Sequence, residues 1–216
     1  MPRLRQVPRS EAGADALKAY QRMFGDRDPV AEPGTATGTP GNWWTVFALV
    51  PDVLTYFQAG GAIYKGPTRE IPPYYVELGI VRAGFAAGSK FVFSQHSKGA
   101  RAAGIAEEKV AAIPHWSATD LFDAKERAVL AYVDEMVLQL GRVQEGTFAL
   151  LAANFSDEAI LELTYIVGLY MMYAVLSRSL RLEYDDVDER VVEAPIPGQA
   201  AATGVDIMSQ MSDSSG

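Results

Sequence analysis

The sequence contains no cysteine among its 216 residues, and this absence excludes several kinds of chemistry at once. Disulfide frameworks, thiolate nucleophiles, cysteine metal ligands and CxxC redox motifs all need the missing thiol. Histidine is almost as scarce, because the chain has only His96 and His115, and neither belongs to an HxH or HxxE pattern. We therefore expect no bound metal ion.

Clusters of basic residues and long apolar runs are also absent from the sequence. The formal net charge is -8, and the basic residues are scattered. Binding to nucleic acid is not expected, because phosphate neutralisation needs clustered Lys and Arg. The first residues lack the apolar segment of a signal peptide. The most apolar run, from Leu163 to Ser177, is shorter than the roughly 20 residues that span a bilayer. We expect a soluble, cytoplasmic protein without a membrane partner.

Alternating strand patterns and internal repeats are absent, whereas helical spacing recurs along the chain. The sequence predicts an all-α fold in which residues 1–41 form an N-terminal arm, a short helix and a loop. Residues 42–185 are predicted to form a helical domain, and 186–216 an acidic and then flexible tail. Asn42 is predicted to cap the helix that follows it, which contains Trp43 and Trp44.

The stretch from Glu77 to His96 predicts a helical hairpin with a turn marked by Gly84 and Gly88. About ten residues, or roughly 15 Å of helix, separate Glu77 from the turn, and about seven residues, or roughly 11 Å, lead from the turn to His96. Antiparallel helices would therefore bring the carboxylate and the imidazole to nearly the same level. A carboxylate beside a histidine can orient the ring, fix its tautomer and raise its basicity, so this pair is the candidate for acid/base catalysis.

This hairpin resembles the carboxymuconolactone decarboxylase-like, or AhpD-like, family. The residues that carry the resemblance are ELGIVRAGFAAGSKFVFSQHSKGARAAGI, from Glu77 to Ile105. In the family pattern a Glu stands twelve residues before a C-x-x-C-x-x-x-H motif, and Glu77, Ser89, Val92 and His96 occupy those places. Two later stretches, DAKERAVLAYVDEM and FSDEAILELTYIVGLYMMYAVLSRSL, are similar to later helices of the family. The resemblance covers about 42–183 and implies an AhpD-like helical bundle.

The departure from the family pattern concerns mechanism. Ser89 and Val92 replace both redox cysteines, and serine has no comparable redox couple, so a thiol peroxidase is not expected. The decarboxylase branch implies a cofactor-free lyase that uses His96 and Glu77 on a small organic carboxylate. Lactone-ring opening or isomerisation could use the same relay. The resemblance also implies a homo-oligomer, a trimer or a hexamer. The alternative is a non-catalytic binding or scaffold protein that retains the fold.

Several further residues are candidates for contact with a small-molecule substrate, and each has a structural alternative. Ser89 stands at a helix start, where it is more often a cap than a partner of His96. Arg82 or Lys90 could meet a substrate carboxylate, although Arg82 could instead pair with Glu77. Gln95 and Ser94 are predicted to face away from His96, and His115 to be exposed. The predicted substrate-binding residues are Tyr74, Arg82, Ser89, Val92, Tyr165, Tyr173 and Trp44.

Overall fold

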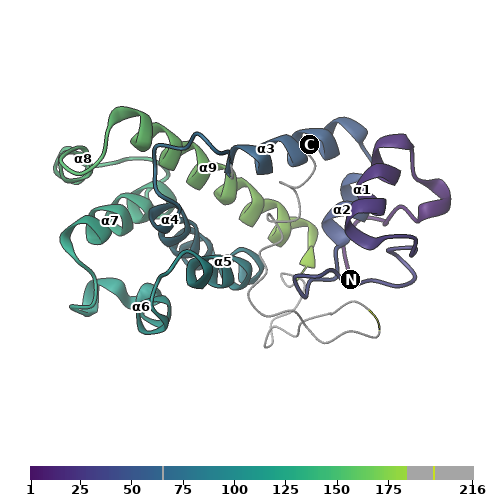
Figure 1. Cartoon of the computed structure of the whole chain (residues 1–216), viewed down its shortest axis with the longest axis horizontal. Coiled ribbons are helices and arrows are strands. Elements are labelled where there is room, and N and C mark those ends of the chain that lie inside the picture. The colour runs from purple at the N-terminus through teal and green to yellow at the C-terminus, as the bar shows by residue number, and fades with distance from the viewer. Residues whose placement is uncertain (65, 184–196, 198–216) are drawn as a thin grey trace. The chain divides into compact units, whose positions relative to one another are not determined.

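The computed structural model of the protein describes residues 1–64, 66–183 and 197 (Figure 1). Within these residues the chain forms nine α-helices and two short 3-10 helices, and it forms no strand. The all-α fold predicted from the helical spacing is therefore confirmed. The predicted tail, residues 186–216, lies outside the described residues except at position 197.

The described residues divide into two compact units. The first consists of residues 1–64 and 176–183, and the second of residues 66–175. The first unit holds η1 (Arg9–Glu11), α1 (Ala14–Phe24), α2 (Asn42–Phe47) and α3 (Pro51–Tyr64). The second holds α4 (Pro73–Ala86), α5 (Lys90–Ala102), α6 (Glu107–Ala112), η2 (Ile113–Ala118), α7 (Ala124–Leu138) and α8 (Glu145–Ala152). The last helix, α9 (Asp157–Leu180), begins in the second unit and ends in the first.

Aromatic side chains from α2 and α3 form the core of the first unit. Trp43 stacks on Phe57 with ring centroids 4.9 Å apart, and Trp44 and Phe47 meet the same ring edge-on. Such contacts stabilise beyond the area they bury. Both tryptophans are fully buried, so this pair lies in the core of the unit.

The start of α2 is held by a residue far along the chain. The N-cap position is Gly41, and no side chain at that position caps the helix. The Glu183 carboxylate accepts hydrogen bonds from the backbone N–H groups of Gly41 and Trp43, at 2.9 and 2.8 Å. Asn42 in turn accepts from the N–H of Glu183 at 2.7 Å. The prediction that Asn42 caps its own helix is wrong, because a negative charge from Glu183 supplies the favourable partner for the helix N-terminus.

The second unit is built on the hairpin of α4 and α5, which lie side by side in Figure 1 and pack directly on each other. A Cβ atom on Gly84 would lie 2.8 Å from the backbone nitrogen of Phe93, so the helices approach too closely there for any side chain. Gly88 takes a φ of 68° in the turn, and Ser89 caps α5 by accepting from the Val92 N–H at 3.2 Å. The predicted hairpin and its turn are confirmed.

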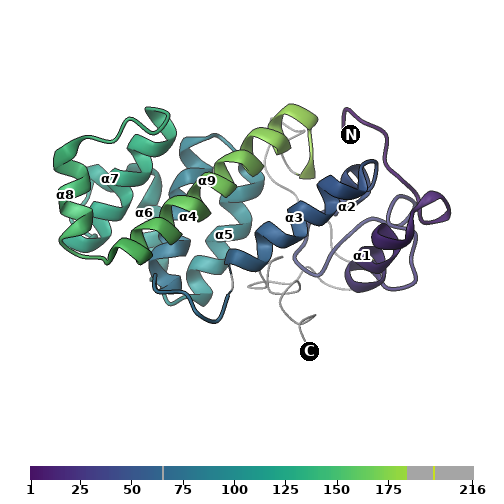
Figure 2. The ribbon, with the colours of Figure 1, turned by 90° about the horizontal axis from the view of Figure 1, so that it is seen from above.

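Other helices of this unit pack on the opposite side of α4. A Cβ atom on Gly79 would lie 3.2 Å from Leu163 of α9 and 3.5 Å from Val133 of α7. Asp123 and Glu126 form a capping box at the start of α7, and α8 packs beside α7 (Figure 2). Helix α4 is therefore central, with α5, α7 and α9 around it, which buries the segment that carries Glu77.

Helix α9 has a buried face and an exposed face, both apolar. By length and composition it is the one helix among the described residues that could cross a membrane, and 44% of its most apolar window is buried. A core helix passes the same test of length and composition. Its exposed large apolar residues are Leu161, Tyr165, Met172 and Val175.

Candidate active site

Glu77 of α4 and His96 of α5 form a buried pair across the hairpin. The Nδ1 atom of His96 lies 2.9 Å from the Oε2 atom of Glu77, and the two residues are only 1% and 4% exposed. An ionised carboxylate can only accept hydrogen bonds, so a neutral imidazole in this contact with ionised Glu77 carries its proton on Nδ1 and leaves Nε2 as the acceptor. The predicted juxtaposition of these two side chains is therefore present, and the contact fixes the orientation of the imidazole.

Gly99 makes room for the carboxylate of this pair. A Cβ atom at position 99 would lie 2.6 Å from both carboxylate oxygens of Glu77, closer than real Cβ contacts allow. Gly99 lies three residues after His96, on the same face of α5. The carboxylate thus rests against the helix backbone beside the ring that it orients, and the absence of a side chain at Gly99 is part of the site.

Two buried tyrosines of α9 extend the site. The ring of Tyr170 meets His96 edge-on with centroids 4.3 Å apart, and Tyr173 meets Tyr170 at 5.4 Å. Burial, and to a smaller degree the nearby Tyr165, raise the pKa of the Tyr173 phenol above its ordinary range. The Tyr173 phenol therefore remains neutral and can act as a hydrogen-bond donor at physiological pH.

The structure places several other predicted substrate-binding residues in structural contacts. Ser89 caps α5 through the N–H of Val92, and both residues are buried. Tyr165 is 54% exposed and lies on a different face of α9 from Tyr170. Trp44 belongs to the aromatic core of the first unit. The positions of these residues therefore favour a helix cap, an exposed helix face and a core over contact with a substrate.

The sequence suggested Glu77 as the acidic partner of Arg82, but the structure pairs Arg82 with a different acidic residue. Its guanidinium donates to both carboxylate oxygens of Asp134, at 2.5 and 3.0 Å. It also donates to the carbonyl oxygens of Ile113 and Pro114. A bidentate pair of this kind fixes the guanidinium in place, so Arg82 ties α4 to α7 and η2, and its expected roles toward Glu77 or a substrate carboxylate lose their support.

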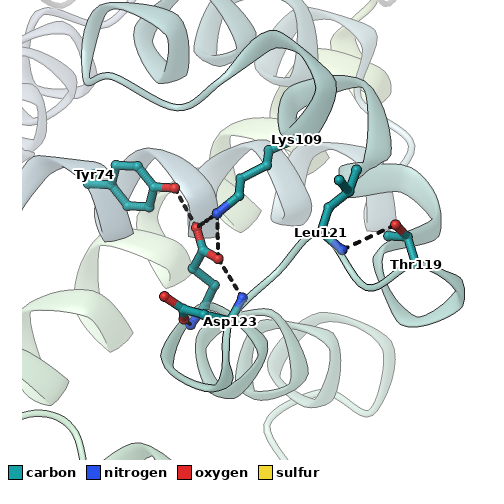
Figure 3. A network of polar contacts seen from close by, with 6 residues as sticks. Tyr74, Lys109, Thr119, Leu121 and Asp123 are labelled. Atoms are coloured by element: carbon teal, nitrogen blue, oxygen red, sulfur yellow. Dashed lines mark hydrogen bonds and ion pairs between the residues drawn. The ribbon is translucent and has the colours of Figure 1, made fainter.

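Tyr74 also points to an acidic residue rather than to His96. Its hydroxyl donates to the carboxylate of Glu126, which also accepts from the ammonium group of Lys109 at 2.6 and 2.7 Å (Figure 3). The second carboxylate oxygen accepts from the backbone N–H of Asp123 at 2.7 Å. Burial and the hydrogen bond to Glu126 raise the pKa of Tyr74 above its ordinary range. This cluster connects α4, α6 and α7.

Gln95 is the residue that sequence reasoning misplaces. Helical spacing predicts that it faces away from His96, at the surface or in an interface, yet it is only 1% exposed. Among the described residues, neither its amide nitrogen nor its amide oxygen has a hydrogen-bond partner. The sequence offers only one signal for a different placement of Gln95, namely a polar residue next to His96 on a helix that is largely buried. His115, by contrast, is exposed as expected.

Within the part of the chain that the structure describes, no group of three or more His, Asp or Glu side chains could hold a metal ion. Glu77 and His96 are two potential ligands, whereas a catalytic zinc site usually takes three from the protein.

Residues 51–135 match the model of the carboxymuconolactone decarboxylase family. This segment is a carboxymuconolactone decarboxylase family region. It includes the whole hairpin with Glu77 and His96, so the resemblance read from the sequence is confirmed. No protein of curated function matches the chain in sequence.

Solved structures share the fold of this chain at low sequence identity. The debrominase Bmp8 superposes with a TM-score of 0.66 at 19% identity, over 82% of this chain and 89% of its own. An alkylhydroperoxidase AhpD core protein from Ralstonia eutropha gives 0.64 at 14%, over 84% and 90%. An AhpD-type protein of unknown function from Agrobacterium tumefaciens gives 0.56 at 22%, over 62% and 92%. The AhpD-like fold is therefore confirmed.

Proposed function

We propose that this protein is a cofactor-independent acid/base enzyme, a lyase that acts on a small organic carboxylate. The observation that carries the proposal is the buried contact of 2.9 Å between Glu77 and His96, inside a carboxymuconolactone decarboxylase region. Perturbed and paired titratable groups cluster at functional sites, and a charged carboxylate is costly to bury unless it has such a partner. The chain has no cysteine, so the thiol route is excluded.

The proposed reaction needs one proton donor. In a decarboxylation, the bond between the carboxylate carbon and its neighbour breaks, carbon dioxide leaves, and the electron pair remains on the neighbouring carbon. In the reacting form His96 is an imidazolium, which carries a proton on each ring nitrogen. It transfers the Nε2 proton to that carbon and becomes neutral, while Glu77 holds Nδ1–H throughout. Solvent then returns the proton to Nε2. Ring opening of a lactone or an isomerisation would use the same two groups.

The test compares the two histidines of the chain. Turnover of a panel of small carboxylates and lactones is followed by product NMR in His96→Gln, Glu77→Gln and His115→Gln. Loss of a general acid or base lowers the rate by about 100-fold or more, so His96→Gln is expected to fall by that amount and Glu77→Gln by a smaller factor. The exposed His115 serves as the matched control and keeps full activity. Full turnover in a folded His96→Gln variant would contradict the relay.

One observation favours a second function, a non-catalytic scaffold or an oligomer. Exposed apolar side chains of α9 recur at helical spacing and form one stripe, and their members are Leu161, Tyr165, Met172 and Val175. Such a stripe is typical of a surface that another helix covers. A homo-oligomer, a trimer or a hexamer, would be detected by light scattering against the monomer mass of 23.4 kDa. An oligomer that turns over no member of the panel would favour the scaffold.

A further inference from the structure

The side chain of Gln95 is fully buried and its hydrogen-bonding capacity is unused. It is 1% exposed, and among the described residues neither Nε2 nor Oε1 has a partner. Burying an amide without hydrogen bonds costs free energy, and native proteins therefore pair nearly all such groups. A buried amide with both ends open indicates that a molecule outside the chain completes its hydrogen bonds.

Gln95 lies on α5, the helix that carries His96 of the candidate active site. It directly precedes His96 on α5, so their Cα atoms are about 3.8 Å apart. One turn further on lies Gly99, against which the Glu77 carboxylate rests. Gln95, His96 and Gly99 are all buried on α5. Gln95 therefore lies next to His96 in the sequence and one turn before Gly99, within the buried part of α5.

The chemistry of the amide restricts what it can bind. Its nitrogen donates and its oxygen only accepts, side by side in one plane. A carboxylate offers acceptors alone, so it would leave the Gln95 oxygen unpaired. Arg82, which the sequence suggested as a cation for a substrate carboxylate, is already paired with Asp134. The best match is an uncharged group that presents a carbonyl oxygen next to an N–H donor.

We propose that Gln95 is a substrate-binding residue that recognises a carboxamide or lactam group through two hydrogen bonds. The proposal rests on the proposed function in one respect, namely that His96 acts on the same molecule. The carboxylate of the proposed substrate is then a separate group from the one that Gln95 contacts. Gln95 selects the uncharged part of the molecule, and His96 carries out proton transfer.

The test uses two probes of nearly identical shape, 2-pyrrolidone and γ-butyrolactone. The first has a carbonyl beside an N–H, and the second replaces that N–H with a ring oxygen. Each is titrated into the full-length ¹⁵N-labelled protein, and the side-chain amide signals are followed by NMR. The Gln95 signals are identified by their absence from the spectrum of Gln95→Leu. We expect the lactam to bind the wild type about tenfold more tightly than the lactone, as one hydrogen bond predicts.

The variants decide whether Gln95 is the source of this preference. In Gln95→Leu the two probes should bind equally, because the amide is gone. Ser94→Ala is the matched control, since it removes a polar group at the adjacent position whose hydroxyl donates to the carbonyl of Phe91. It should keep the tenfold preference. Equal binding of both probes by the wild type, or an unchanged preference in Gln95→Leu, would overturn the proposal.

A second measurement separates a binding role from a structural one. If Gln95 is kept for a ligand, leucine removes an unpaired buried amide, and the ligand-free Gln95→Leu protein should unfold at the same temperature as the wild type or about 2 °C higher. A structural glutamine would give a clear fall in that temperature, which would overturn the proposal. Probe binding in His96→Gln distinguishes this proposal from the proposed function. If His96→Gln keeps both the lactam preference and full turnover, the Glu77–His96 relay is contradicted, whereas the proposal for Gln95 is supported.

Discussion

Two buried glutamates of the second unit, Glu77 and Glu126, show how one residue type can serve two purposes. Both lie on helices that pack against each other, α4 and α7, and they are 4% and 2% exposed. Glu126 accepts hydrogen bonds from a lysine, a phenol and a backbone N–H (Figure 3). Glu77 contacts an imidazole, a group whose charge changes near neutral pH.

The two glutamates differ in the chemistry of the groups that they contact. The Lys109 ammonium group can only donate hydrogen bonds, and with Tyr74 and Asp123 it holds Glu126 in a connection between three helices. The imidazole of His96 can gain and lose a proton, so the Glu77 pair has two states. The residue before His96 is Gln95, whose side-chain amide has no hydrogen-bond partner among the described residues. A buried carboxylate by itself therefore indicates neither role, and its partners decide.

The largest expected effect is the loss of stability in Glu126→Ala. This substitution leaves the partly buried ammonium group of Lys109 and the hydroxyl of Tyr74 without their shared acceptor. Removing one member of a buried pair costs about 3–5 kcal/mol. Urea unfolding measures the loss. The double variant Glu126→Gln with Lys109→Met, which leaves no charge behind, should recover more than half of it.

Glu77→Gln is the comparison for that variant, because it keeps the shape of the side chain and removes the charge. Its free energy of unfolding should change by less than that of Glu126→Ala, while its turnover should fall. If Glu126→Ala instead unfolds at the wild-type urea concentration and Glu77→Gln retains full turnover, both assignments are contradicted.

Most of the fold could be predicted from the sequence because its signals are local. Pro73 at the start of α4, Ser89 at the cap of α5 and Asp123 at the capping box of α7 mark helix ends in their own segments. The pairing of Glu77 with His96 needed only helix rise and an antiparallel turn. Each of these inferences uses neighbouring residues alone, and each agrees with the structure.

The partners of polar side chains could not be predicted in the same way, because they come from distant parts of the chain. Glu183 reaches the start of α2 across 140 residues, and Arg82 meets Asp134 across 52. Spacing on one helix says which face a side chain lies on, but not what covers that face. Gln95 is misplaced for this reason, since the burial of its face depends on tertiary packing.

The next prediction concerns Gly99. It distinguishes the roles of the two glutamates further, because we expect only Glu77 to depend on this residue. In Gly99→Ala the new Cβ atom would lie 2.6 Å from both Glu77 oxygens, so the carboxylate must move away from the position in which it holds His96. Overpacking of this kind costs about 1–3 kcal/mol, and a displaced catalytic group costs about 100-fold in rate. Turnover and urea unfolding measure the two effects.

Gly168→Ala is the matched control for that substitution. Gly168 also lies inside a helix, α9, but a Cβ atom there would meet nothing within 4 Å. The added methyl group should stabilise the protein by about 0.5–1 kcal/mol, because alanine loses less chain entropy than glycine on folding. A Gly99→Ala protein that behaves like this control would show that the Glu77 carboxylate does not depend on the open backbone at Gly99.

The smallest expected effect is an alkaline loss of stability that depends on Tyr74. Burial first, and then the hydrogen bond to Glu126, raise the pKa of its phenol above the ordinary range. The folded protein therefore holds this proton more tightly than the unfolded chain does. The resulting stability is fully present below the unfolded pKa of about 10 and is lost as the pH rises above it.

Unfolding in urea at pH 9 and pH 11 should show Tyr74→Phe losing less stability than the wild type, by up to about 1 kcal/mol after solvent screening. Tyr56→Phe, at a side chain that is 78% exposed, is the control and should follow the wild type. If Tyr74→Phe loses as much as the wild type, the hydroxyl adds nothing to the Glu126 cluster, and the connection between the three helices then depends on Lys109 and Asp123.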